Sequence, residues 1–162
     1  MTRLDILVVD DTYVLATWGR TFIQIWRGAP KASTTARMHE LSSAFVASSS
    51  LPATSLFIVE AKSPSPDEAS RKILAAFSRD VVGRMSLSVV VAEGGGFRGA
   101  LVRAVGVALT TILPHRSRFK FVDDVATAAE LLGPHLLAGS GGPEALLRVA
   151  AEARSKLPSV AA

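Results

Sequence analysis

Strand-like and helix-like segments alternate along this chain, and this alternation narrows the possible folds more than any other feature of the sequence. Compact or alternating apolar runs, typical of strands, occupy residues 4–9, 13–18, 21–26, 55–59, 87–92 and 119–122. Segments with a helical repeat of apolar residues lie at 33–46, 65–79, 97–112, 125–132 and 143–157. Strands that alternate with helices favour a mostly parallel sheet, to which we assign four or five strands. The sequence therefore predicts an α/β fold with helices packed against the sheet.

The first three apolar runs break this alternation because no helical segment separates them. Gly19 and Arg20 lie between runs 13–18 and 21–26, and apolar residues alternate with others in both runs. A two-residue connection between such runs predicts an antiparallel β-hairpin. We expect this N-terminal hairpin to extend the parallel sheet.

Residues 65–68 carry several signals for the start of a helix. Ser65 is a suitable N-cap, Pro66 suits the first helical position, and Glu68 completes a capping box. The residues that we expect to face the sheet from this helix are Ala69, Ile73, Ala76 and Phe77.

The length and composition of the chain predict one main domain. The chain has 162 residues, of which 49% are hydrophobic, so it can bury a core without the help of disulfides. It contains no cysteine, which excludes both disulfides and thiolate metal sites. The glycine-rich residues 139–142 divide an α/β domain of residues 1–137 from a linker and C-terminal helix in 138–162. We expect this tail to be dispensable for folding and to become ordered by docking on the domain or on a second subunit, because an isolated helix of about 15 residues is marginal in water.

Charge and hydropathy predict a cytoplasmic protein that binds neither nucleic acid nor membrane. The net charge is +4, and the densest basic cluster, residues 115–120, is interpreted as a solvated turn because aromatic residues make up only 6% of the chain. The first residues lack the long apolar core of a signal peptide. The apolar segment 97–113 contains Arg98 and Arg103 and is too short to span a bilayer.

The chain shows no complete catalytic constellation. His39, His115 and His135 are far apart in the sequence, which predicts no metal site, and no nucleophile motif of the form G-x-S-x-G is present. We therefore predict no catalytic residues, no cofactor and no enzymatic activity.

One glycine-rich segment supports an alternative function, a small nucleotide-binding domain. Gly94, Gly96 and Gly99 match the pattern G-x-G-x-x-G between a predicted strand and a predicted helix, where backbone N–H groups could hold a phosphate. A dinucleotide-binding fold normally carries this pattern after its first strand. The competing interpretation is a glycine-rich helix start without a ligand.

Residues 6–11 resemble the first strand and acidic pair of a response-regulator receiver. In that resemblance Glu60 falls near the phosphoacceptor aspartate, Ala92 replaces the usual Ser or Thr, and Lys120 matches the family's lysine. The second alternative function is therefore a degenerate receiver-like domain. The competing interpretation is that Asp10 and Asp11 form a turn.

Two short motifs resemble proteins with a STAS-like domain, which are related to anti-sigma-factor antagonists. The motifs are Trp26-Arg27-Gly28, after the hairpin, and Gly96-Phe97-Arg98, followed by Arg103. The resemblance covers residues 4–132 and rests on these motifs and the order of elements. It implies a STAS-like topology and a regulatory module that binds another protein.

The resemblance also implies where such a module would be switched. In the family's best-known members, a serine at the start of the helix after a central strand is phosphorylated, and the matching region here contains Ser63 and Ser65. Our candidate interaction or switch residues are Ser63, Ser65, Trp26, Arg27 and Arg98. We expect the exposed part of the hairpin and residues 63–68 to bind a partner protein, and the sequence leaves open that the partner is a second copy, forming a homodimer.

Overall fold

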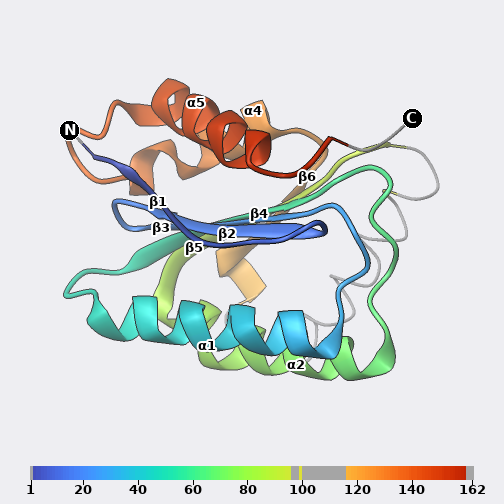
Figure 1. Cartoon of the computed structure of the whole chain (residues 1–162). Coiled ribbons are helices and arrows are strands. Elements are labelled where there is room, and N and C mark those ends of the chain that lie inside the picture. Colours follow the sequence, from blue (N-terminus) through green and yellow to red (C-terminus); the bar gives the residue numbers. More distant parts are fainter. Residues whose placement is uncertain (1, 96–98, 100–115, 160–162) are drawn as a thin grey trace.

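The computed structural model describes residues 2–95, 99 and 116–159 and contains one six-stranded sheet with the order β1-β2-β3-β4-β5-β6 (Figure 1). The strands are β1 (Leu4–Val9), β2 (Tyr13–Trp18), β3 (Thr21–Trp26), β4 (Ala53–Val59), β5 (Met85–Ala92) and β6 (Phe119–Val122). The pairs β1–β2 and β2–β3 are antiparallel, and the pairs β3–β4, β4–β5 and β5–β6 are parallel. The α/β fold and the N-terminal hairpin are confirmed. The sheet is nevertheless mixed, with six strands rather than four or five.

Asp10 stabilises the turn between β1 and the antiparallel strand β2. Its carboxylate oxygen accepts hydrogen bonds from the backbone N–H groups of Thr12, at 2.6 Å, and Tyr13, at 3.1 Å. The backbone N–H of Asp10 donates to the carbonyl of Tyr13 at 3.1 Å. The interpretation of Asp10 as a turn residue is therefore confirmed.

Helices cover both faces of the sheet (Figure 1). Helices α1 (Ala32–Ser48) and α2 (Glu68–Asp80) lie on one face, and α4 (Val125–Leu132) and α5 (Gly142–Ser155) lie on the other. The alternation along β3 divides its side chains between two cores. Phe22 and Trp26 pack toward α1 and α2, whereas Ile23 and Ile25 pack toward α4 and α5.

The start of α2 differs from the prediction. Asp67, not Ser65, is the N-cap, and its carboxylate accepts a hydrogen bond from the N–H of Ser70 at 2.7 Å. This bond lowers the pKa of Asp67. A tertiary contact fixes this choice, because the Ser70 hydroxyl donates to the carbonyl of Pro30 at 2.9 Å. Ala69, which we expected to face the sheet, is exposed because it lies in the first turn of the helix, whereas Phe77 on the same predicted face is buried.

The C-terminal helix α5 packs into the core on its side of the sheet, where it contacts β1, β2 and β3. The buried residues that it and the following turn contribute are Ala145, Leu146, Ala150, Ala153 and Leu157. That residues 1–137 fold alone stays a prediction. The burial of α5 against three strands indicates instead that residues 1–137 need this helix in order to fold.

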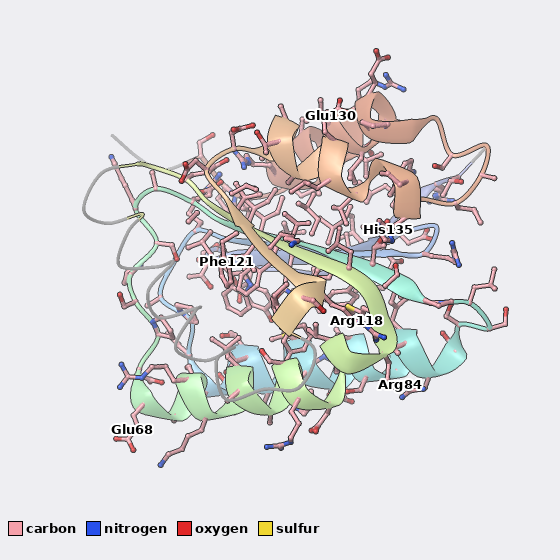
Figure 2. The ribbon with its side chains drawn as sticks, turned by 180° about the vertical axis from the view of Figure 1, so that it is seen from behind. Glu68, Arg84, Arg118, Phe121, Glu130 and His135 are labelled. Atoms are coloured by element: carbon pink, nitrogen blue, oxygen red, sulfur yellow. The ribbon has the colours of Figure 1, made fainter. Side chains whose placement is uncertain are left out.

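The basic segment before β6 is partly built into the fold. Arg118, which Figure 2 shows beside the start of β5, donates from Nη1 to the carbonyls of Gly83 and Met85 at 2.5 and 3.3 Å. Arg118 therefore ties the start of β6 to the start of β5, while Lys120 is exposed.

The segment 97–113, with the helix predicted in it, lies outside the described residues apart from Gly99. In the described part of the chain, no helix is long and apolar enough to cross a membrane.

Candidate functional site

The parallel strands bring three charged residues to one edge of the sheet. In the register of β3, β4 and β5, Trp26 lies beside Val59, and Val59 lies beside Ala92. The residues that follow these three are Arg27, Glu60 and Glu93. In open α/β sheets, this carboxyl edge is where ligands usually bind.

Arg27, Glu60, Glu93 and Arg154 form what we call the carboxyl-edge cluster. The Nε and Nη2 atoms of Arg27 donate to the two carboxylate oxygens of Glu60 at 2.7 and 3.1 Å. The hydrogen bonds that Arg27 donates to Glu60 raise the pKa of Arg27. Arg154, near the end of α5, donates from Nη2 to Glu93 at 2.6 Å, and its Nε lies 3.6 Å from Glu60. The two positive and two negative charges balance, and they tie α5 to three strands.

An open depression of about 520 Å³ lies beside this cluster. Its lining residues are Arg27, Ala151, Arg154, Ser155, Leu157 and Ser159. An anionic ligand there would have to compete with Glu60 and Glu93 for the two guanidinium groups, and a third donor of Arg27, Nη1, already bonds the carbonyl of Pro158. We therefore interpret the carboxyl-edge cluster as a structural tie rather than a ligand site.

Three loops at this edge are joined by close contacts around Gly28. Its N–H donates to the carbonyl of Thr12 at 2.9 Å, and its own carbonyl accepts a hydrogen bond from the buried Ser63 hydroxyl at 3.0 Å. A Cβ atom at position 28 would lie 2.5 Å from the Thr12 methyl carbon, so only glycine fits without movement. The β1–β2 turn and the loops before α1 and α2 therefore form one connected surface.

The structure places the candidate switch and interaction residues in different environments. Ser65 is exposed, whereas Ser63 is buried and hydrogen-bonded. Trp26 is only 1% exposed and stacks on Tyr13 with 5.0 Å between ring centroids, so a partner could reach it only by opening the core. Arg27 is held by Glu60, and Arg98 lies outside the described residues.

Neither the comparison with protein-family models nor the search of curated proteins gives a match for this chain.

The backbone conformation and the packing of the loop explain why residue 94 is a glycine. Its φ of 101° lies in the left-handed region, and a Cβ atom there would lie 2.8 Å from the Cβ of Ala61. The N–H of Gly99 donates to the carbonyl of Gly95 at 3.2 Å, while Gly96 lies outside the described residues. The described part of the loop therefore needs a glycine at position 94 whether or not it binds a phosphate.

The acidic and histidine residues do not assemble into a metal centre in the part of the chain that the structure describes. The carboxylates of Asp10 and Glu60 are engaged by the hairpin turn and by Arg27. His39 belongs to α1 on one face of the sheet, and Figure 2 shows His135 on the side of α4. His115 lies outside the described residues.

The sequence interpretation named Arg27 and Glu60 but missed Glu93 and Arg154. Glu93 carried a usable signal, because it directly follows an apolar strand as Arg27 and Glu60 do. Arg154 carried none, because its contact with Glu93 depends on how α5 docks.

The two serines lead to a stability prediction. Replacing Ser63 with alanine removes a buried hydrogen bond, and we expect it to lower the free energy of unfolding by about 1 kcal/mol and the melting temperature by about 2–4 °C. Ser65→Ala is the matched control and should change stability by less than about 0.5 kcal/mol, because Ser65 is exposed. Equal effects in thermal denaturation would contradict the assigned environments.

Proposed function

We propose that this chain is a non-enzymatic, cytoplasmic regulatory module that binds another protein, with a STAS-like fold. The observation that carries this proposal is the open edge of β1, which pairs only with β2 among the strands that the structure describes. Alternate N–H and C=O groups of an edge strand point away from the sheet. Leu7 and Val9 on this strand are 40% and 46% exposed.

An extended segment of a protein can form hydrogen bonds with more of the unpaired backbone groups of such an edge strand than a small ligand can. Strand addition supplies a row of backbone hydrogen bonds, and exposed apolar side chains on the same strand add contact area. Five large apolar residues are exposed in the described part of the chain, namely Leu7, Val9, Leu51, Leu131 and Leu137. Two of the five lie on this one strand of six residues, so the edge combines both features of a docking surface.

Ser65 is the residue that we propose as the regulatory position of this module. It is exposed in the loop that the buried Ser63 fixes to Gly28. A phosphate would add nearly two negative charges. At this position it would alter the surface next to Lys62 and Asp67 without entering the core. Ser63 would have to leave its buried hydrogen bond to be modified.

Site-specific photo-crosslinking in the source cell tests the proposed function. A photoreactive amino acid at Leu7 should give protein adducts, whereas the same group at Lys72 should not, although the Lys72 side chain is 75% exposed. The adducts should disappear when Val9→Lys is added. Equal adducts from both positions, or none from position 7, would contradict binding at the β1 edge.

The rival nucleotide-binding function gives a different expected result. If the chain is a protein-binding module, ATP, GTP and NAD should leave its melting temperature unchanged. A specific ligand at one hundred times its dissociation constant would stabilise the fold by about 2.7 kcal/mol. A shift of that size, lost in Gly96→Val, would support the nucleotide-binding alternative.

A further inference from the structure

We propose that the partner at the β1 edge is a second copy of this chain, paired antiparallel so that two six-stranded sheets become one. The inference rests on the proposed function, because it names the partner of the same edge. It is carried by a β-bulge, by the faces on which the β1 side chains lie, and by the charges at the two ends of the strand.

A bulge at Leu7 sets the faces of the β1 side chains. Ile6 lies opposite Ala16 and Val8 lies opposite Leu15, so Leu7 is one extra residue on β1. Leu4 and Ile6 pack on the core beneath α5, and Val8 packs on the core above α1 and α2. Val9 lies opposite Val14, a member of the core beneath α5, and therefore faces that side. The alternation of faces is shifted by one residue after the bulge.

The shifted faces restrict how two β1 strands can pair. A two-fold axis perpendicular to the sheet leaves each side chain on its own face, and residues directly opposite must share a face. Leu4 can therefore lie opposite the second copy's Val9, and Asp5 opposite its Val8. A shift of one residue would place Leu4 opposite the second copy's Val8, which faces the other side.

The charges favour this same register. It places Arg3 opposite the second copy's Asp10, and the two-fold axis repeats the contact. Both residues are exposed, with the Arg3 side chain at 88%. Arg3 already lies 3.7 Å from Asp5 of its own strand, so it would lie between two carboxylates. A shift of two residues would instead place Asp5 opposite Asp10. Complementary charges at both ends are the reason to favour a second copy over an unrelated strand.

The bulge and Asp5 are also features that protect edge strands from indiscriminate pairing. In this register they do not prevent association but limit it to one alignment. A single pair of six-residue strands is a small interface, so we expect a reversible dimer whose population depends on concentration.

Sedimentation velocity on the full chain over a range of concentrations tests the inference. We expect a monomer–dimer equilibrium whose dissociation constant rises more than about a hundredfold in Val9→Lys, which places a charge against Leu4 twice. Arg3→Asp should raise it about tenfold by turning two attractive contacts into repulsive ones. Lys72→Asp changes the net charge by the same amount at an exposed site on α2, away from the β1 edge. This variant should leave the dissociation constant unchanged.

Mixing two charge variants tests the register itself. Arg3→Asp and Asp10→Arg should each self-associate weakly, and their equimolar mixture should regain the dimer because both end contacts become attractive. Asp10 also holds the hairpin turn, so the melting curve of Asp10→Arg is measured first; if it is unfolded, the comparison of Arg3→Asp with Lys72→Asp decides.

A wild-type chain that stays monomeric at all concentrations overturns the inference, as does a dimer that Val9→Lys does not weaken. If the wild type is monomeric and position 7 still crosslinks to a different protein, the proposed function holds and only the second copy is excluded. If neither association nor crosslinking occurs, both proposals fail.

Discussion

A chain truncated after Leu137 should lose cooperative folding. Removal of α5 uncovers the face of the sheet that carries Ile23 and Ile25. Leu146 and Leu157 are almost fully buried, and losing such side chains costs about 2–5 kcal/mol each. Their combined loss of about 4–10 kcal/mol is comparable to the whole stability of a typical domain, about 5–15 kcal/mol. Near-ultraviolet circular dichroism and thermal melting measure the effect.

The matched control for this truncation keeps the helix and changes only the linker. Insertion of about four Gly and Ser residues after Gly139 should be tolerated, because each doubling of a loop's length costs only about 0.6 kcal/mol. Gly139 has a φ of 78° and open space around the position of a Cβ atom. A truncated chain that melts cooperatively near the wild-type temperature would instead support a domain boundary at residue 137.

Replacing Glu60 with alanine should have the largest effect of any single change in the carboxyl-edge cluster. Glu60 accepts two hydrogen bonds from Arg27 and lies 3.6 Å from Arg154, so its removal leaves two partly buried cations without that partner. Breaking a fully buried ion pair costs about 3–5 kcal/mol, and the partial exposure of this cluster reduces the expected loss to about 2–3 kcal/mol. The melting temperature should fall by about 5–10 °C.

Glu68→Ala is the control for Glu60→Ala, because it removes the same charge from an exposed pair. Glu68 contacts Lys72 within α2, and both side chains are 75% exposed. We expect a change below about 0.5 kcal/mol. If thermal denaturation gives the two variants similar stability, the cluster does not tie α5 to the sheet.

The sequence predicted the parts of this fold that depend on local patterns. The alternation in 13–18 and 21–26 located the hairpin and assigned Ile23 and Ile25 to the opposite face from Phe22 and Trp26, as observed. A period of two residues fixes these faces whatever the rest of the chain does. The order of the six strands could not be predicted from the sequence, because a local pattern does not determine which strand pairs with β3.

The errors in the sequence interpretation have a common physical cause. Ser65 and Asp67 both satisfy the local rules for an N-cap, and a distant contact between Ser70 and Pro30 favours Asp67. The assignment of Arg154 to the carboxyl-edge cluster likewise depends on the docking of α5. The sequence interpretation named Arg27 and Glu60 of the carboxyl-edge cluster. It also named Ser63 and Ser65, but it did not distinguish the buried serine from the exposed one.

Amide hydrogen exchange along β1 tests most directly the claim that its free edge is the interaction surface. We predict that the amides of β1 that point away from β2 exchange rapidly in dilute protein. They should become protected as the concentration rises or when the protein captured from position 7 is added. The exchange rates of amides in the central strands β3 and β4 should not change, because each of these strands is hydrogen-bonded to a neighbouring strand on both sides. Exchange rates along β1 that stay the same under both conditions would contradict the account.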